Sequence, residues 1–435
     1  MAYFIIETEE QLMQLQGSEK CFIELVSLSE ESHPKLNSPC VLYYNDFEKG
    51  YIISINHSEA FSIPLESVQI FLSKIPKVYL LDKKWHSYFF NLPNAVDVYF
   101  TILDLDGNIK DFNCFTNIHN DFHHRFNYSE DVNAIIPISK HYERCECMYE
   151  AIRPYIGKEG NLAWQNAYID AYKWVEEQGL TVDLKLFDKY FEPVWKARSM
   201  RDSTIYTSYN LYNVTSRPTN AFNGINFLAF NKDNHSRSTF IPKNDVFVEF
   251  DFDGYHLRLV ANLLNIEIPL NESIHTHLGK LYFNQETLTP EEYQESKKIT
   301  FRQMYNGVDA KYKNIPLFQH ISELVESLWA VYQLIGYVEL PNERKLVQEN
   351  ANPQKLFNYY IQCLETVNNV KKLTKLKNLL EGKKSRIVLV VYDSILVDFS
   401  KEDGRETLDQ IKRILEEDNY VIKAQIGNNY NFHTD

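Results

Sequence analysis

Two aspartates that each follow a strongly apolar run are the clearest candidates for chemistry. Asp251 comes after Val-Phe-Val-Glu-Phe, and Asp393 comes after Val-Leu-Val-Val-Tyr. A carboxylate at the lip of a sheet is costly to bury without a cation, so we expect the two to share divalent metal. Two such metals roughly 4 Å apart suit phosphoryl transfer, because they activate the attacking oxygen and neutralise the leaving one. The alternative is that each aspartate is a turn or N-cap residue.

A second candidate set lies on a helix predicted over residues 291–305. Lys297, Phe301 and Tyr305 recur there every four residues. At about 100° per residue the three side chains share one face of the helix. The lysine could hold a triphosphate while a base stacks on the phenyl ring. The alternative is an ordinary amphipathic helix with an exposed lysine.

A third set of residues could in principle bind zinc. Its members are Cys114, His119, His123, His124, Cys145 and Cys147. Their spacing matches no standard zinc finger, so scattered surface histidines are the better interpretation.

The elements that must position these residues follow from the apolar pattern. Short runs rich in β-branched and aromatic residues predict strands over 20–27, 39–44, 51–55, 77–82 and 96–102, with a helix over 65–74. Helical periodicity dominates 162–201, with Gly179 as a helix stop, and 255–384. A buried strand over 246–253 ends in carboxylates, and a hairpin over 386–398 turns at 392–394. The chain then continues with a helix over 405–417 and a short strand over 421–426.

Composition and charge limit the class of protein. The chain has 435 residues, 44% of them hydrophobic, which excludes wholesale disorder. No stretch approaches the roughly 20 apolar residues of a membrane span, and the first residues lack a basic signal region, so we expect a soluble protein without a membrane partner. Six irregularly spaced cysteines indicate free thiols in a reducing compartment. A net charge of −14 excludes a uniformly basic nucleic-acid coat but allows a local basic groove.

Eight short motifs follow one another through the C-terminal half. They are Thr215-Ser-Arg217 with Asn223 and Asn226, Arg237-Ser-Thr-Phe-Ile-Pro242, Asp251-Phe-Asp-Gly-Tyr-His-Leu-Arg258, Ile274-His275, Lys297-x3-Phe301-x3-Tyr305, Asn358-x3-Gln362, Val391-Tyr-Asp-Ser394 and Ile426-Gly-Asn-Asn-Tyr-Asn-Phe432. In this order and spacing they resemble family A DNA polymerases, the bacterial polymerase I type. Each motif alone is weak, but eight in the correct order make coincidence a poor explanation.

The resemblance implies a role for each matching residue. Asp251 and Asp393 would bind two Mg²⁺ ions with help from the carbonyl of Phe252. Lys297 would contact the triphosphate and protonate the pyrophosphate leaving group. The remaining substrate contacts would be His275 at the β-phosphate, Phe301 on the incoming base, Tyr305 beside the template, His256 beside the sugar, and Arg258 bracing the template or the palm.

The residues implied at DNA fall into two groups. The first would meet the minor groove of the primer-template and comprises Arg217, Asn223, Asn358 and Gln362; minor-groove acceptors report pairing geometry without sequence. The second is a basic stretch suited to a phosphate backbone and comprises Lys371, Lys372, Lys375, Lys377, Lys383, Lys384 and Arg386. The alternative for this stretch is a solvated charged helix.

Three departures from the family pattern change the expectations. Tyr293 replaces an arginine one turn before Lys297, so one phosphate contact is missing or comes from Lys298 or Arg302. His256 replaces the glutamate that packs under the sugar, which puts the exclusion of ribose in doubt. Ser394 follows Asp393 as it does in the distantly related single-subunit RNA polymerases. Phe301 and the Thr-x-Arg element favour a DNA product.

The resemblance divides the chain into three regions and predicts two losses. Residues 1–135 would be a ribonuclease H-like, degenerate 3′→5′ exonuclease domain, 136–216 a connector with a reduced thumb, and 217–435 a palm with fingers inserted at about 266–340. The first strand keeps only Glu24, no aspartate occurs at 83–86, and Asp97 lacks recognisable partners, so we expect no proofreading. Only 34 residues separate Asp183 from Arg217, too few for long thumb helices.

These observations predict a mixed α/β, right-hand polymerase fold and a template-directed DNA polymerase. Primer-template DNA, deoxynucleoside triphosphates and two Mg²⁺ ions are its expected ligands, and a protein partner would replace the thumb's grip. A compact chain of this composition would suit a phage or mobile element in a bacterial cytoplasm. The alternatives are a polymerase-like structural subunit that holds DNA without synthesis, and a polymerase with relaxed ribose discrimination.

Overall fold

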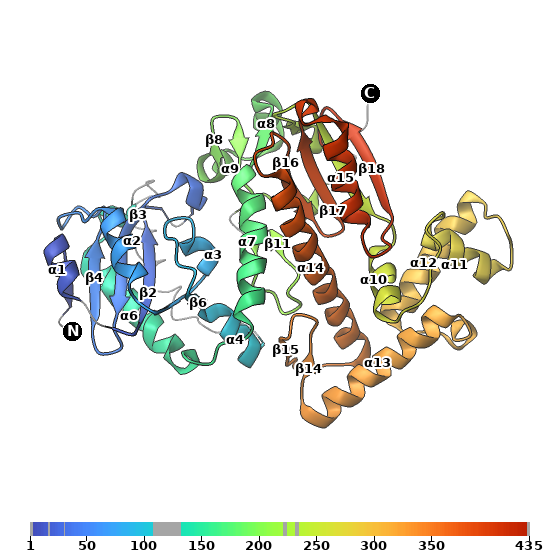
Figure 1. Ribbon diagram of the computed structural model, residues 1–435, viewed down its shortest axis with the longest axis horizontal. Helices are drawn as coiled ribbons and strands as arrows, with labels where there is room; N and C mark the ends of the chain where they lie inside the picture. The colour runs from blue at the N-terminus through green and yellow to red at the C-terminus, as the bar shows by residue number, and fades with distance from the viewer. Residues whose placement is uncertain are drawn as a thin grey trace. The chain divides into compact units, whose positions relative to one another are not determined.

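The computed structural model describes residues 3–15, 18–29, 31–107, 132–220, 224–230 and 235–432. They form two compact units, each built from helices and strands (Figure 1). Met1–Asp170 with Val194–Arg201 makes the first unit, and Ala171–Pro193 with Asp202–Asp435 makes the second. The predicted mixed α/β class is confirmed.

The first unit contains a six-stranded sheet in the order β1-β4-β3-β2-β5-β6. Strands β2, β3 and β4 form an antiparallel meander, while β5 and β6 extend the sheet parallel to β2. Its elements are β1 (Phe4–Ile6), α1 (Glu9–Gln14), β2 (Lys20–Ser27), β3 (Pro39–Asn45), β4 (Gly50–Ser54), α2 (Leu65–Ser73), β5 (Lys77–Leu80), α3 (Lys83–His86), β6 (Ala95–Asp97), α4 (Val98–Asp106), α6 (Ile138–Ile152), α9 (Pro193–Ser199) and β8 (Met200–Arg201).

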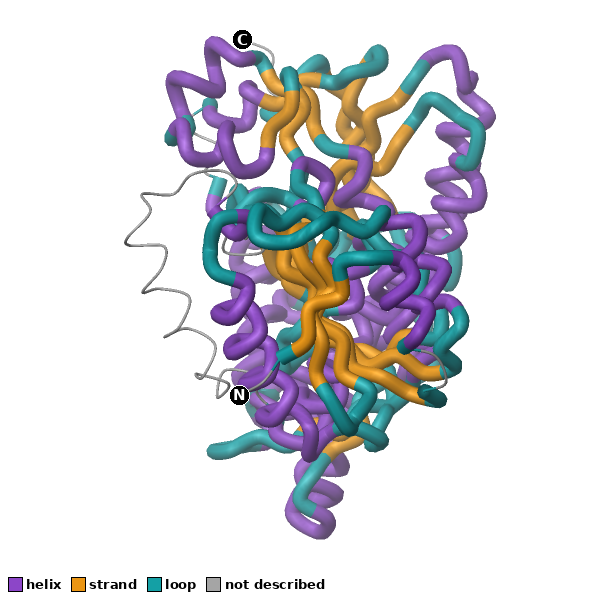
Figure 2. The backbone as a smooth tube through the Cα atoms, turned by 90° about the vertical axis from the view of Figure 1, so that its left-hand side faces the viewer, coloured by secondary structure: helices purple, strands orange, loops and turns teal. Residues whose placement is uncertain are grey.

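Apolar side chains are buried on both faces of this sheet. One core packs α1 and α2 against the strands through residues such as Leu12, Val68 and Leu72. The other packs α4 and α6 against the opposite face through residues such as Ile102 and Tyr149. Strands flanked by helices on either side are visible in Figure 2. This explains why β2 and β3 have nearly continuous apolar sequences, since neither face is left to solvent.

The strand predicted over 96–102 is wrong for most of its length. Strand β6 ends at Asp97, and helix α4 begins at the next residue. The Asp97 carboxylate causes the switch, because one oxygen accepts the backbone N–H of Tyr99 at 3.0 Å and caps the helix. Its other oxygen accepts the N–H of Lys83 at 2.8 Å. β-Branched and aromatic residues in α4 had favoured a strand, and the cap together with burial outweighs that preference.

The second unit holds the elements that carry the motifs. Helix α7 (Leu162–Gln178) enters it and stops at Gly179, whose φ of 65° is left-handed. The others are β7 (Leu180–Val182), α8 (Leu184–Tyr190), β9 (Thr204–Ile205), β10 (Tyr209–Asn210), β11 (Thr219–Asn220), β12 (Phe240–Ile241), β13 (Val246–Phe252), α10 (Tyr255–Leu263), α11 (Ile274–Phe283), α12 (Pro290–Asn306), α13 (Pro316–Ile335), β14 (Val338–Glu339), β15 (Lys345–Leu346), α14 (Pro353–Leu380), β16 (Arg386–Val391), β17 (Ser394–Phe399), α15 (Gly404–Glu416) and β18 (Ile422–Gly427).

An antiparallel sheet in the order β16-β17-β13-β18 is the platform of this unit. Register places Asp251 of β13 opposite Ser394 on β17 and opposite Lys423 on β18. Helices α10 to α14 share an apolar core that includes Leu257, Phe318 and Phe357. Among the described residues, no helix is long and apolar enough to cross a membrane.

Candidate active site

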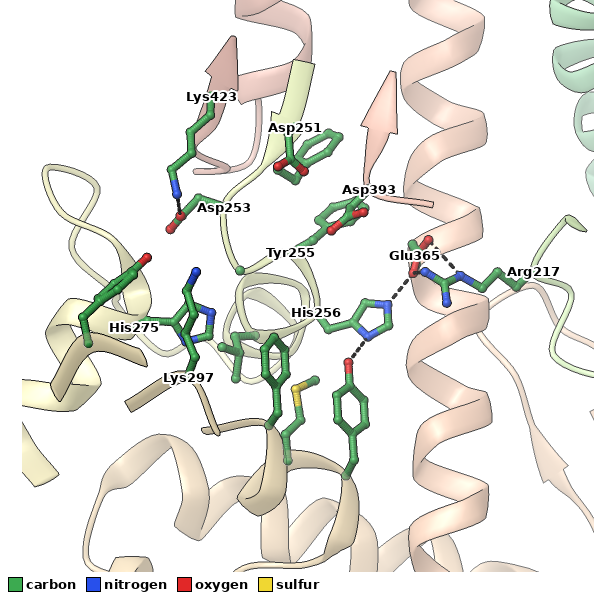
Figure 3. Close-up of a pocket in the computed structure, with 17 residues that line it drawn as sticks. Arg217, Asp251, Asp253, Tyr255, His256, His275, Lys297, Glu365, Asp393 and Lys423 are labelled. Atoms are coloured by element: carbon green, nitrogen blue, oxygen red, sulfur yellow. Dashed lines mark hydrogen bonds and ion pairs between the residues drawn. The ribbon is translucent and has the colours of Figure 1, made fainter. Parts of the chain in front are cut away.

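A cavity of about 300 Å³ opens in the second unit where β13, α10, α11, α12, α14 and the β16–β17 turn meet (Figure 3). It gathers most of the residues that the motifs single out. Those in its lining are Arg217, Asp251, Phe252, His256, His275, Lys297, Phe301, Tyr305 and Asp393. The lining also contains Asp253, Gly254, Tyr255, Leu257, Tyr293, Met304, Glu365 and Lys423.

The two predicted aspartates lie at the same end of the sheet, Asp251 near the end of β13 and Asp393 in the turn between β16 and the neighbouring β17. The backbone N–H of Phe252 donates to the carbonyl of Asp393 at 3.0 Å, which fixes the end of β13 beside the hairpin turn. Asp393 follows Tyr392, whose φ of 55° is unusual for a bulky residue. The Arg217 guanidinium lies 3.4 Å from the centre of the Tyr392 ring, and Asn369 donates to the Tyr392 carbonyl at 3.0 Å. These contacts hold the turn that presents Asp393.

Gly254 forms the turn that follows the strand carrying the other carboxylate, Asp251. It caps α10 with a φ of 59°, and a Cβ atom there would lie 2.2 Å from Ile274. A larger residue would therefore strain the sharp turn that leads from β13 into the helix. Asp251, before this turn, and His256, on the first turn of α10 after it, both line the cavity (Figure 3).

The acidic pair suits a hard divalent cation. Withdrawal from bulk water raises the pKa of Asp393, and repulsion from Glu365 adds to this, while Arg217 and His256 oppose it. A divalent ion would reverse that shift, because it stabilises the charged form. The described residues hold no cluster of three or more His, Cys, Asp or Glu side chains able to bind a metal. Mg²⁺ would fit here with two carboxylates and a backbone carbonyl, completing its shell with water and substrate oxygens.

Cationic and polar groups occupy the opposite side of the cavity. Lys297 projects from α12 with its Nζ 4.7 Å from the centre of the Tyr293 ring. A reciprocal capping box starts this helix, since Thr289 and Glu292 each bond the other's backbone N–H. Burial lowers the pKa of His275 to about 4, so its imidazole is neutral at pH 7. Its Nδ1 is buried and has no hydrogen-bond partner among the described residues.

Aromatic rings form the floor beside Lys297. Phe301 and Tyr305 stack with their centroids 6.2 Å apart and an interplanar angle of 12°, and Phe301 lies 5.3 Å from the His275 ring. Phe301 is 46% exposed although it is large and apolar. The predicted shared face of Lys297, Phe301 and Tyr305 is confirmed, and it offers a flat apolar surface suited to a base.

A hydrogen-bonded chain closes the far side of the cavity. Tyr305 and His256 Nδ1 are 2.6 Å apart, and His256 Nε2 bonds Glu365. Glu365, only 1% exposed, also receives a two-pronged contact from Arg217 at 3.1 and 2.9 Å. Burial raises the pKa of Tyr305 to about 12, so its hydroxyl stays protonated and is available as a hydrogen-bond donor toward His256. The chain therefore fixes His256, Tyr305 and Arg217 together.

The motifs did not identify three of these lining residues. Asp253 was recognised only as part of an acidic strand end, while Glu365 and Lys423 were not singled out at all. Asp253 could have been found from its position two residues after Asp251, in the turn that directly follows β13. Glu365 and Lys423 depend on how α14 and β18 pack against β13 and α10, and no local signal marks them.

The predicted substrate-binding role of Arg258 is replaced by a structural one. It is 2% exposed, and its guanidinium donates to the carbonyls of Asp253, Pro269 and Glu272 at 3.1, 3.2 and 3.4 Å. Of the two roles that the resemblance offers, bracing the palm is the one that this geometry permits. The side chain ties the end of β13 to the loop before α11.

We expect Arg258→Ala to lower the free energy of unfolding by about 3 kcal/mol, because it leaves three carbonyls without their donor and removes a cation beside the buried Asp253 carboxylate. Arg258→Lys should lose less, since it keeps one donor and the charge. Urea denaturation of both variants measures the effect. Equal stability of wild type and Arg258→Ala would contradict the bracing role.

Lys372 is also corrected, because it does not lie on a DNA-accessible surface. It is 1% exposed, and its Nζ donates to the carbonyls of Ile414 and Glu417 at 3.0 and 3.2 Å, near the C-terminal end of α15. Lys371 and Lys375 are exposed but pair with Asp418 at 3.1 Å and Glu417 at 2.5 Å. The basic stretch on α14 therefore anchors α15 through three of its lysines.

We expect Lys372→Met to leave DNA affinity unchanged, as measured by fluorescence anisotropy of a labelled primer-template. Burial lowers the pKa of Lys372 to about 8, below the value of about 10.4 for an unfolded lysine. The unfolded chain then binds more protons between these two values, so wild-type stability should rise with pH in that window relative to Lys372→Met. If Lys372→Met weakens DNA binding without changing the free energy of unfolding, Lys372 binds DNA at the surface after all.

The remaining predicted residues lie apart from the cavity lining. Asn358 and Gln362 occupy α14 about two turns and one turn before Glu365, respectively, and neither lines the cavity. Lys298 and Arg302 are 76% and 67% exposed, pair with Glu295 and Asp309, and do not line the cavity. Asn223 lies outside the described residues, as do four of the six zinc candidates. The other two, Cys145 and Cys147, are free thiols.

Comparison with known proteins gives a structural match but no sequence match. No protein-family model and no curated protein matches the sequence. A solved structure of the POL domain of Pol1 from M. smegmatis, in complex with DNA primer-template and dNTP, superimposes with a TM-score of 0.73. The chain has a polymerase-domain fold. The match covers 99% of this chain and 100% of the other at 11% identity, so the predicted polymerase-type architecture is confirmed at the level of the fold.

Proposed function

We propose that this protein is a template-directed DNA polymerase that adds deoxynucleotides to a primer 3′ end. The observation that carries the proposal is one cavity in a polymerase-type fold, with Asp251 and Asp393 side by side and with Lys297 and the Phe301 ring opposite them. The similar M. smegmatis domain was solved with primer-template and dNTP, which supports the same ligand classes for this chain.

Each part of the cavity has a place in the proposed reaction. The primer 3′ hydroxyl gives up its proton to solvent as its oxygen forms a bond to the α-phosphorus of the nucleotide, and the bond from that phosphorus to the pyrophosphate oxygen breaks. Magnesium held by Asp251 and Asp393 would supply charge neutralisation at the reacting phosphate. Lys297 contacts the triphosphate and gives its proton to the departing pyrophosphate. Neutral His275 offers an imidazole N–H to a phosphate oxygen, and Phe301 stacks on the incoming base.

A second proposal concerns the sugar. His256 stands in the cavity where its ring is held by Tyr305 on one side and Glu365 on the other. If this ring leaves room for a 2′-hydroxyl, the protein should incorporate ribonucleotides as well as deoxynucleotides. Comparing ribo- with deoxynucleotide incorporation by wild type and by His256→Glu tests this, and equal discrimination by the two proteins would contradict it.

The proposal includes the loss of two features, a full-length thumb and proofreading. Between Asp183 and Arg217 the helices are α8 and α9, each seven residues and so about 10 Å long. Such helices are too short to grip duplex DNA like a full thumb, so we propose that a protein partner supplies processivity.

The Asp97 carboxylate accepts a backbone N–H with each of its two oxygens, which supports the proposed absence of proofreading. Excision of a mismatched primer end by the purified protein would contradict the absence of proofreading.

Primer extension with purified protein tests the function. A labelled primer on templates that differ in the first unpaired base should gain only the complementary nucleotide, and chelation of Mg²⁺ should stop the reaction. Addition that ignores the template would contradict template direction. Tight binding of primer-template with no extension under any metal condition would favour the structural-subunit alternative.

A further inference from the structure

Lys423 is a cation of the cavity for which the predicted reaction has no role. It lies on β18 directly opposite Asp251 in the sheet register, and its Nζ forms an ion pair with Asp253. The side chain is 56% exposed, so it is able to change its rotamer. Figure 3 shows it on the same side of the cavity as Lys297 and His275.

The cavity is short of positive charge for a triphosphate. His275 is neutral at pH 7, as its lowered pKa indicates. Arg217 is held by Glu365 and by the Tyr392 ring. Tyr293 carries no charge. Among the described lining residues, this leaves Lys297 and Lys423 as the cations on the phosphate side, and both lie close enough to His275 to contribute to its low pKa.

Asp253 is built to keep its charge compensated when Lys423 moves away. It is 5% exposed, and it accepts the backbone N–H of Ile274 at 3.3 Å, at the start of α11, where the helix dipole favours an anion. The Ser273 hydroxyl donates to it at 3.4 Å, and the Arg258 guanidinium lies 3.9 Å away. Departure of Lys423 would therefore not leave a bare buried carboxylate.

We propose that Lys423 is a further triphosphate-binding residue, resting on Asp253 in the free protein and turning to the phosphates when the nucleotide binds. The inference deepens the proposed function and rests on it. Lysine suits the role because its ammonium is a compact charge on a flexible stem, able to exchange one anionic partner for another. The contact would take the place of the arginine that Tyr293 replaces on α12.

Nucleotide binding to a complex with a dideoxy-terminated primer tests the proposal without requiring catalysis. We expect Lys423→Ala and Lys423→Gln to weaken dNTP binding by about tenfold, the effect of removing one charged hydrogen bond. Inhibition of extension by inorganic pyrophosphate should weaken by a similar factor, because it occupies the same subsite. Affinity for primer-template should be unchanged. Testing both Lys423 variants keeps the proposal testable even if one of them misfolds.

Two further variants separate binding from a structural role. Lys298→Ala removes a lysine of α12 that lies outside the cavity, and it should leave dNTP affinity unchanged. Asp253→Asn removes the resting partner, so it should strengthen dNTP binding or leave it as it is. If Asp253→Asn weakens binding as much as Lys423→Ala does, or if Lys423→Ala has no effect, the inference is wrong. The proposed function fails separately, if Lys297→Ala and Asp393→Asn still extend primers.

Discussion

Asp393→Asn is expected to lower the rate of nucleotide addition by at least about 10³-fold, and Asp251→Asn by a similar factor, because each removes a preorganised charge at the reacting phosphate. Asparagine has nearly the same size and can still accept one hydrogen bond, so the packing of the β16–β17 turn should survive. Single-turnover primer extension at saturating dNTP measures the chemical step directly.

Stability provides the control for this result. The pKa of Asp393 is raised by its removal from water and by Glu365 nearby, which means that its charge costs folding free energy without a bound cation. Asp393→Asn should therefore unfold at the same urea concentration as wild type or at a higher one. A variant that is stable and still extends primers at the wild-type rate would refute the catalytic assignment.

Local sequence patterns were sufficient to predict the bounds of an element wherever its own residues specify it. The helix carrying Lys297 was predicted to within one residue at each end from its four-residue spacing, and the structure adds a capping box and a proline in the first turn that fix its start. The hairpin at 386–398 was equally clear, since two apolar runs flank a short polar turn. These two elements place Lys297 and Asp393, which explains why the sequence alone could predict an acidic pair facing a lysine.

Tertiary contacts decide the residues that sequence patterns missed. Lys372 looked like one of a run of surface lysines, yet it lies on the helix face of Glu365, Asn369 and Leu376, all of which are buried. Successive members of this face are three or four residues apart, a pattern that the many neighbouring lysines obscured. For Glu365 no such signal exists, because its partners His256 and Arg217 lie more than 100 residues away in sequence.

Lys297→Ala should lower the rate of nucleotide addition by about 10²–10⁴-fold, the usual range for a general acid, and should also weaken dNTP binding. Lys297→Arg separates the two effects. Arginine keeps the positive charge but does not give up a proton near neutral pH. We therefore expect the arginine variant to bind dNTP nearly as well as wild type and to remain slow in the chemical step.

Pre-steady-state titration of dNTP gives both quantities for each variant, and Lys298→Ala is the matched control on the same helix. If Lys297→Arg restores the rate, then Lys297 acts by charge alone, and proton transfer to pyrophosphate must come from solvent. If instead Lys297→Ala changes only dNTP affinity, the lysine is a binding residue. A slow arginine variant with normal affinity is the result that only a proton donor explains, because every electrostatic contribution of the side chain is then still present.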